Sequence, residues 1–211
     1  MVARMPRKRK ASSHSPFYTR IGNRGWRKSG YDTFAFRSSA FRKWMGSQLA
    51  AGEAAILSVG CGAGELEGEL SAAGLTVVGL DLSHAMLRRG LQNGLGMAVQ
   101  ADAAALPFEA RTFDAVMFVE SIGYLRLDDV FKEARRVLKP DGRLMITSYP
   151  AQIDAHARYR KWRIEQVMEA MIAAGFTIAS RQYLNIVKNR VNEAPSERRC
   201  KLFYLSSSEP R

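Results

Sequence analysis

The chain has 211 residues, of which 46% are hydrophobic, and a formal net charge of +12. This length and apolar content are enough for one substantial hydrophobic core but short for two. The two cysteines lack C-x-x-C spacing and the three histidines lie in separate segments, which excludes a disulfide framework and a zinc site. No apolar run reaches the roughly 18 residues of a spanning helix and no signal-peptide core follows the basic start, so we expect a soluble, cytoplasmic protein.

Positive charge is concentrated at the start of the chain. Residues 1–50 hold 12 of the 32 Lys and Arg residues and a single acid, Asp32. Residues 1–15 are a basic, serine-containing tail without periodicity, which predicts disorder. Residues 16–50 interleave aromatic and basic side chains, and residues 33–49 can form a helix that we expect to cover a cleft of the following domain. One side of this helix would hold Phe34, Phe41, Met45 and Leu49.

Three interpretations of this basic aromatic cap segment, residues 16–50, stay open. The aromatic side chains can pack on the domain and leave the arginines in water. The arginines can instead recognise an acidic substrate or an anionic membrane surface, where each cation adds about 1 kcal/mol. The third interpretation is RNA binding, with phosphates neutralised by basic residues and bases stacked on aromatic rings. The membrane or acidic-substrate interpretation is slightly favoured over RNA, because the chain has no added RNA-binding domain.

The third segment, residues 51–211, is the predicted catalytic domain, and a glycine-rich loop follows its first strand. Ile56 to Val59 read as a buried strand, and the loop that follows places a glycine at every second position. Glycines at such positions let the backbone turn sharply and approach a ligand. They are Gly60, Gly62 and Gly64.

A carboxylate follows the second strand of this unit. Residues 65–73 read as a helix and residues 76–80 as a strand that ends at Asp81, 21 residues after Gly60. A carboxylate at this place can accept both hydroxyl protons of a ribose. The pattern predicts a Rossmann-like sheet, although the third glycine comes one residue too early for the G-x-G-x-x-G loop of dinucleotide folds.

Further strands follow at regular intervals. Residues 99–108 contain a strand that ends in Asp102, and the sequence TFDAVMFV at 112–119 gives a fourth apolar strand. Residues 137–148 give a Pro-Asp-Gly turn that leads into a fifth. After a helix over residues 160–175, we expect two more strands at 177–187 and 201–206, with the polar linker 192–199 at the substrate opening.

These motifs together resemble those of class I S-adenosylmethionine-dependent methyltransferases, and most closely the broad type 11 branch. The resemblance rests on the G-x-G-x-G loop, the acidic strand ends, F-D-x-V and R-V-L-K-P-D-G-R-L, and covers about residues 51–150. It implies an α/β fold with a Rossmann-like seven-stranded sheet, mostly parallel with an antiparallel last strand, flanked by helices and preceded by cap helices. It also implies S-adenosyl-L-methionine as the cofactor and S-adenosyl-L-homocysteine as its product.

The resemblance assigns roles to the cofactor-binding residues by position. The three glycines shape the loop around Cys61, Asp81 holds the ribose and Asp102 the adenine amine, while Leu82 and Ala103 flank the ring. Ser58 departs from the family, which usually has Asp or Glu at this position. Since a serine hydroxyl cannot offset the positive charge of the cofactor, we expect weaker cofactor binding.

The methyl group of a sulfonium is already activated, so the protein mainly has to hold the acceptor behind it and exclude water. Glu120 could take a proton from an amine or hydroxyl acceptor, or could be an adenosine-side or structural contact. Tyr124 could orient the acceptor or pack at an edge, and Tyr31 is a candidate lid. We expect a small molecule or lipid headgroup methylated at N or O. Two alternatives are an RNA-directed methyltransferase and a non-catalytic cofactor-binding regulatory protein.

Overall fold

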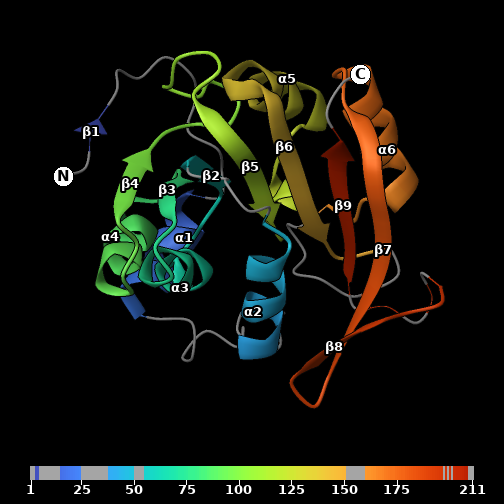
Figure 1. Ribbon diagram of the computed structural model, residues 1–211. Helices are drawn as coiled ribbons and strands as arrows, with labels where there is room; N and C mark the ends of the chain where they lie inside the picture. Colours follow the sequence, from blue (N-terminus) through green and yellow to red (C-terminus); the bar gives the residue numbers. More distant parts are fainter. Residues whose placement is uncertain are drawn as a thin grey trace.

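The computed structural model describes residues 3–4, 15–24, 38–49, 55–150, 160–196, 198, 200 and 202–208. These residues build a nine-stranded sheet in the order β1-β4-β3-β2-β5-β6-β9-β7-β8 (Figure 1). The strands are β1 (Ala3–Arg4), β2 (Ala55–Val59), β3 (Thr76–Asp81), β4 (Met97–Gln100), β5 (Phe113–Val119), β6 (Leu138–Ser148), β7 (Thr177–Val187), β8 (Arg190–Glu193) and β9 (Leu202–Ser208). The helices are α1 (Ser15–Arg24), α2 (Ser39–Ser47), α3 (Glu65–Ala72), α4 (His84–Gln92), α5 (Leu127–Val137) and α6 (Ile164–Ala173), with a short 3-10 helix, η3 (Ile122–Tyr124).

The predicted seven-stranded sheet is present and carries one additional strand at each edge. From β1 to β6 along the sheet, neighbouring strands are parallel. β9 runs antiparallel to both β6 and β7, so the last strand has the predicted direction and β7 returns to the direction of β6. The additions are β1, two residues of the predicted basic tail that pair with β4, and β8, which forms a hairpin with β7. Other residues of the tail, up to 14, lie outside the described residues.

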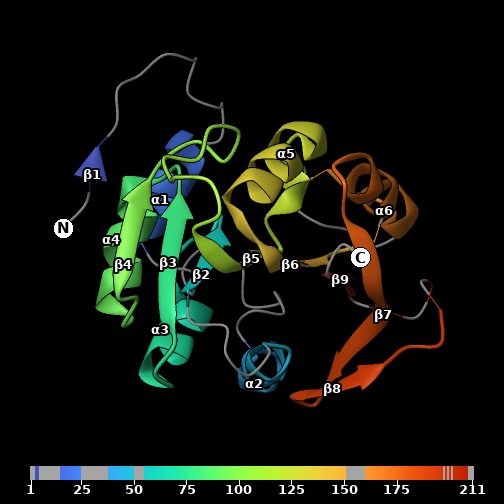
Figure 2. The same ribbon diagram turned by 45° about the horizontal axis from the view of Figure 1, so that its top comes forward.

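Two apolar layers form because the strands are buried on both faces. On one face α5 and α6 pack against β5, β6 and β9, with Phe118 and Phe131 in edge-to-face contact. On the other face α2, α3 and α4 contribute Phe41, Leu66 and Leu87 (Figure 2). Full burial of an aliphatic or aromatic side chain contributes about 1.5–3 kcal/mol, so these layers hold the sheet rigid beneath the loops at its edge.

The helix predicted at residues 33–49 is α2, and residues 33–37 lie outside the described residues. Its predicted apolar side is confirmed at Phe41 and Met45, which are buried. Its predicted place over the ligand cleft is wrong. α2 lies beside α3 through the ion pair of Arg42 with Glu69 (2.7 Å), and none of its residues lines the cavity described below.

A contact between distant parts of the chain secures α2. The side chain of Asn189, in the turn between β7 and β8, reaches the start of this helix. Its Oδ1 accepts hydrogen bonds from Ser38 Oγ (2.7 Å) and Ala40 N (3.3 Å), and its Nδ2 donates to Ser39 Oγ (3.0 Å). The amide therefore satisfies part of the helix terminus that the helix itself leaves unpaired.

The Asp of the F-D-x-V motif holds strands together. Asp114 Oδ2 accepts the amide of Ala55 at 2.9 Å, and Asp114 Oδ1 pairs with Lys139 Nζ at 2.6 Å. Residues 139–142, which include the predicted Pro-Asp-Gly turn, form an irregularity within β6, because Phe113 pairs with Leu138 and Ala115 already with Arg143. In the part of the chain that the structure describes, no helix is both long enough and apolar enough to cross a membrane.

Candidate functional site

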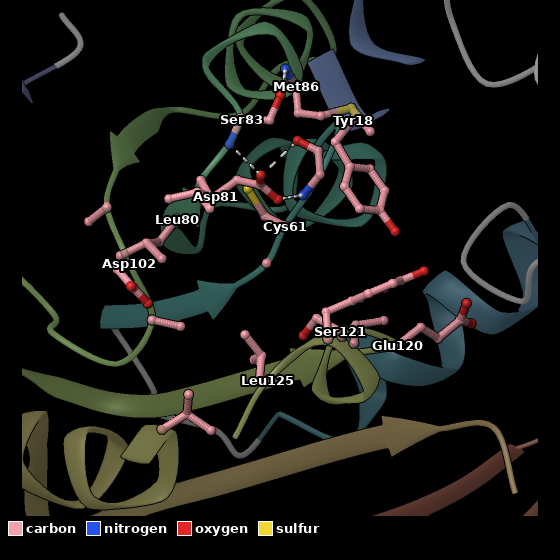
Figure 3. A pocket seen from close by; sticks show the side chains of 18 of the residues that line it. Tyr18, Cys61, Leu80, Asp81, Ser83, Met86, Asp102, Glu120, Ser121 and Leu125 are labelled. Carbon is pink, nitrogen blue, oxygen red and sulfur yellow. Dashed lines mark hydrogen bonds between the residues drawn. The ribbon is translucent and has the colours of Figure 1, made fainter. Parts of the chain in front are cut away.

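A cavity of about 380 Å³ lies at the carboxyl ends of β2, β3, β4 and β5. β2 and β5 are neighbours at which the chain changes its direction of progress across the sheet, and ligands of open α/β sheets bind at such switch points. The walls come from the glycine loop, the start of α3, the ends of the strands and the segment between β5 and α5. α1 adds Tyr18, which lies on the same side of the cavity as Met86 and Cys61, across from Glu120 and Ser121 (Figure 3).

The glycine loop has the backbone conformation that its sequence predicts. Gly60, Gly62 and Gly64 have φ angles of 73°, 55° and 63°, a region that residues with a Cβ rarely adopt. The amide of Gly60 donates to Leu80 O at 2.7 Å, and a Cβ on Gly60 would lie 2.6 Å from the Cβ of Ser121. The loop therefore needs glycine both for its turn and for its close approach to the end of β5.

Asp81 joins the glycine loop to the end of β3 (Figure 3). Its Oδ2 accepts the amide of Gly62 at 3.0 Å and its Oδ1 accepts the amide of Ser83 at 2.8 Å. Burial raises the pKa of this carboxyl, and the hydrogen bonds from Ser83 and Gly62 lower it in part. A carboxylate has about four lone-pair positions, so Asp81 can hold the loop and still accept a hydroxyl proton from a ligand.

Asp102 and Ala103 lie in the same cavity, in the loop after β4. Asp102 is exposed and its Oδ1 accepts the amide of Ala104 at 3.0 Å, whereas Ala103 is buried. Leu82 lines the cavity from the end of β3. The predicted set of a carboxylate with two apolar side chains is therefore assembled from the ends of two neighbouring strands.

An ion pair on α5 holds the loop after β4 in place. Arg136 donates to Phe108 O (2.7 Å) and Leu106 O (2.8 Å) and pairs with Glu133 Oε2 (2.8 Å). Glu133 Oε2 also accepts the amide of Leu106 at 2.7 Å, and hydrogen bonding to Arg136 lowers the pKa of this carboxyl. Backbone groups that would otherwise be unpaired thus fix the loop that carries Asp102.

Glu120 follows β5 directly and lines the cavity. It has a φ of 54°, uncommon for a residue other than glycine, and only 7% of it is exposed. Its amide donates to Thr147 O at 2.9 Å, and its Oε2 accepts the hydroxyl of Tyr149 at 2.6 Å. The predicted catalytic carboxylate is therefore held by a phenol from the end of β6, a partner that the motifs do not reveal.

Two tyrosines face each other at the cavity. The rings of Tyr124, in η3, and Tyr18, in α1, make an edge contact with centroids 5.4 Å apart. Burial raises the pKa of Tyr124, a hydrogen bond with Tyr18 lowers it, and the charge of Glu120 raises it. The predicted lid residue Tyr31 lies outside the described residues. Among the described residues of the cap segment, the aromatic residue that lines the site is Tyr18, and its only signal in the sequence was the aromatic density of that segment.

Ser58, in β2, donates a hydrogen bond of 2.5 Å to Oε1 of Glu67, in α3. Both side chains are buried, and Glu67 lines the cavity. Burial raises the pKa of Glu67 from 4.5 to about 7, although the hydrogen bond from Ser58 lowers it. Sequence reasoning missed Glu67, since an acid in the first turn of a helix is ordinary by itself.

Cys61 also lines the cavity from inside the glycine loop. Burial, Glu67 and Asp81 raise the pKa of its thiol well above the ordinary value, which keeps it protonated and unreactive. None of the described residues of the predicted substrate-opening linker, 192–196 and 198, lines the cavity, and Asn192 and Glu193 pair with β7. Among the described residues, no group of His, Cys, Asp and Glu side chains is arranged to hold a metal ion.

The cavity fits the predicted cofactor in its chemistry. Three glycines leave room for a ligand at the backbone, Asp81 offers carboxylate oxygens to hydroxyl groups, and Asp102 can accept from an amine. Met86 and Ala103 supply apolar surface for a ring. A nucleoside with a cationic substituent matches this combination of acidic and apolar groups.

Comparisons with known proteins find similarity to methyltransferases. Residues 57–146 match the family described as "Methyltransferase domain". A malonyl-[acyl-carrier protein] O-methyltransferase of Methylococcus capsulatus is 33% identical over 149 residues, which cover 64% of this chain and 52% of the relative. An 18S rRNA (guanine-N(7))-methyltransferase of Saccharomyces cerevisiae is 30% identical over 138 residues, which cover 58% of this chain and 47% of the relative. The chain thus spans about half the length of these two relatives.

The fold is shared with solved structures. An S-adenosylmethionine-dependent methyltransferase of Thermotoga maritima superposes with a TM-score of 0.73, covers 92% of this chain and 99% of its own, and is 18% identical. At this identity the likeness concerns the fold alone, whereas the family match covers the glycine loop, both acidic strand ends and β5. Residues 57–146 of this chain therefore match a methyltransferase domain, and the described fold is that of a solved S-adenosylmethionine-dependent methyltransferase.

Proposed function

We propose that this chain transfers the methyl group of S-adenosylmethionine to a nitrogen or oxygen atom of a small molecule or lipid headgroup. The observation that carries the proposal is the place of Glu120. Its buried carboxylate lies at the end of β5, lines the same cavity as the glycine loop, and accepts the Tyr149 hydroxyl at 2.6 Å. A carboxylate so placed can accept a proton from an amine or hydroxyl acceptor.

The residues of the site divide the work. The cofactor supplies a methyl group already activated by the sulfonium charge. Glu120 places a negative charge on the acceptor side of the cavity. Its left-handed backbone conformation, directly after β5, fixes the position of this carboxylate. Tyr124 and Tyr18 form an aromatic wall that excludes water and can orient the acceptor.

The rim of the cavity supports an acceptor with both polar and apolar parts. Arg126 and Asp129 line it as an ion pair (3.3 Å), beside Leu125 and Val130. The Methylococcus relative carries an O-methyltransferase name and the Saccharomyces relative an rRNA methyltransferase name, so the family spans both acceptor classes. We favour the small-molecule or lipid class, with the basic residues of the cap segment drawing the chain toward an anionic membrane surface.

The experiment is an acceptor screen on the intact chain. S-adenosylhomocysteine release is measured with S-adenosylmethionine and, separately, with amines, phenols, carboxylic acids, phosphatidylethanolamine vesicles and total RNA. Turnover with a small molecule or with vesicles, reduced at least tenfold in kcat by Glu120→Gln while the cofactor Kd is unchanged, is the expected result. Turnover with RNA alone would overturn the acceptor class, and cofactor binding without turnover on any acceptor would favour a regulatory role.

A further inference from the structure

We infer that Glu67 is a cofactor-binding residue of this chain, and that it supplies from α3 the negative charge that β2 lacks at Ser58. The inference goes beyond the family pattern, in which the acid stands on the strand. Glu67 is 3% exposed, Ser58 is 1% exposed, and their side chains share a hydrogen bond of 2.5 Å. The carboxyl group of Glu67 therefore lies directly beside the position that the family fills with an acid.

The surroundings of Glu67 point to a cationic ligand. A carboxylate is costly to bury unless a positive charge pairs with it. The charged groups that face Glu67 are acidic, namely Asp81 from β3 and Glu65 from the same helix, and both raise its pKa. Among the described residues, its side-chain partner is a serine hydroxyl and no ion pair reaches it. Since Glu67 lines the cavity, a cationic group of a ligand can provide the missing pairing.

The helix holds Glu67 at this place with little freedom to move. Gly68 allows α3 to approach the turn after α4, because a Cβ on Gly68 would lie 2.0 Å from Asn93 O. Leu66 and Leu70, on the same helix, are buried in the core beneath it. Packing of α3 thus holds Glu67 buried in the lining of the cavity that the glycine loop also lines.

The cation that fits is the ammonium group of the amino-acid part of the cofactor. An ammonium group paired with Glu67 favours the ionised carboxylate, whereas burial raises the pKa of Glu67 to about 7 in the free protein. Binding therefore releases a fraction of a proton at neutral pH. The other acids that face this carboxyl are Asp81 and Glu65, and the charge of Glu67 also acts on the Cys61 thiol, whose pKa it raises.

The test is calorimetry of S-adenosylhomocysteine binding from pH 6 to pH 8, in buffers of different ionisation enthalpy. For the intact chain we expect affinity to rise several-fold between pH 6 and pH 7, to level off above it, and to be accompanied by proton release. Glu67→Gln should weaken binding at least tenfold at pH 8 and remove this proton release. Glu69→Gln, on the exposed side of the same helix, is the matched control and should change neither.

Two further measurements separate charge from structure. The swap Ser58→Asp with Glu67→Gln moves the acid back to the strand and should restore at least half of the lost factor. 5′-Methylthioadenosine lacks the amino-acid part, so Glu67→Gln should bind it as the intact chain does. An equal loss for 5′-methylthioadenosine and S-adenosylhomocysteine, or unchanged S-adenosylhomocysteine binding, would overturn the inference. If Glu67→Gln does not fold, the swap variant and the pH profile of the intact chain test the inference instead.

None of these measurements needs a methyl acceptor, so their outcome is independent of the proposed function.

Discussion

The Tyr149 hydroxyl donates a 2.6 Å hydrogen bond to Glu120 Oε2, and this contact joins the ends of β6 and β5 at the cavity. Tyr149→Phe removes the donor and leaves the packing of the ring. We expect kcat with the acceptor found in the screen to fall about tenfold, because a buried carboxylate without its hydrogen bond is held less precisely, at a cost of about 1–3 kcal/mol. The cofactor Kd from calorimetry should stay within a factor of two. A matching loss in cofactor affinity would contradict a role on the acceptor side.

We expect Asp81 to have two roles, binding the cofactor and holding the glycine loop in place. Asp81→Ala removes the acceptor of the Gly62 and Ser83 amides, and we expect cofactor affinity to fall at least a hundredfold. Asp81→Asn keeps one acceptor oxygen and should give an intermediate loss. Calorimetry of both variants measures whether their cofactor affinities follow this order. Asp141→Ala, which removes an exposed acid in β6, serves as the control. Equal affinities for the Asn and intact forms would show that the charge has no part in binding.

The pKa of Glu67 gives a pH dependence of stability with a definite sign. Because folding raises this pKa from 4.5 to about 7, the native state binds the proton more tightly than the unfolded chain does. The associated stability is fully present below pH 4.5 and is lost as the pH rises through 7, a change of about 3 kcal/mol in the free energy of unfolding. Urea unfolding of the intact chain and of Glu67→Gln between pH 4.5 and 8 isolates this contribution. The difference between the two proteins should fall as the pH rises, and a difference independent of pH would disprove the raised pKa.

Arg136 should affect the cofactor at a distance, since it holds the loop of Asp102. Arg136→Lys keeps the charge but cannot bridge the carbonyls of Leu106 and Phe108 while pairing with Glu133. We expect a loss of about 1–2 kcal/mol in stability and a three- to tenfold weaker cofactor Kd. Lys132→Ala, exposed on the same helix, should change neither quantity.

The turn between β7 and β8 allows a paired test of the contact with α2. Lys188 and Asn189 both have positive φ angles, 48° and 56°, so glycine relieves backbone strain at either position. Lys188→Gly should therefore raise the free energy of unfolding slightly. Asn189→Gly also removes three hydrogen bonds at the start of α2 and should lower it by about 1–2 kcal/mol. Opposite signs in chemical denaturation would confirm the contact, whereas two increases would disprove it.

Local sequence was sufficient for the glycine loop and the strands around it. Gly60, Gly62 and Gly64 adopt positive φ angles that favour glycine, and the short continuous apolar run before them is the pattern typical of a parallel strand buried on both faces. The acids Asp81 and Asp102 were predictable for a similar reason, since each stands where an apolar strand ends. In these places the physical requirement falls on residues that are adjacent in the chain.

The contacts that only the tertiary structure decided join side chains that come from different elements of the fold. Glu67 beside Ser58, Tyr149 on Glu120, Tyr18 against Tyr124, and Asn189 at the start of α2 carry no periodicity or spacing that sequence reasoning can detect. Each depends on the packing of a helix or strand against a different element, and packing is set by shape and volume across the whole core. The sequence therefore predicted the cofactor from residues that are adjacent in the chain, and the fold decided which other side chains lie beside the glycine loop and beside Glu120.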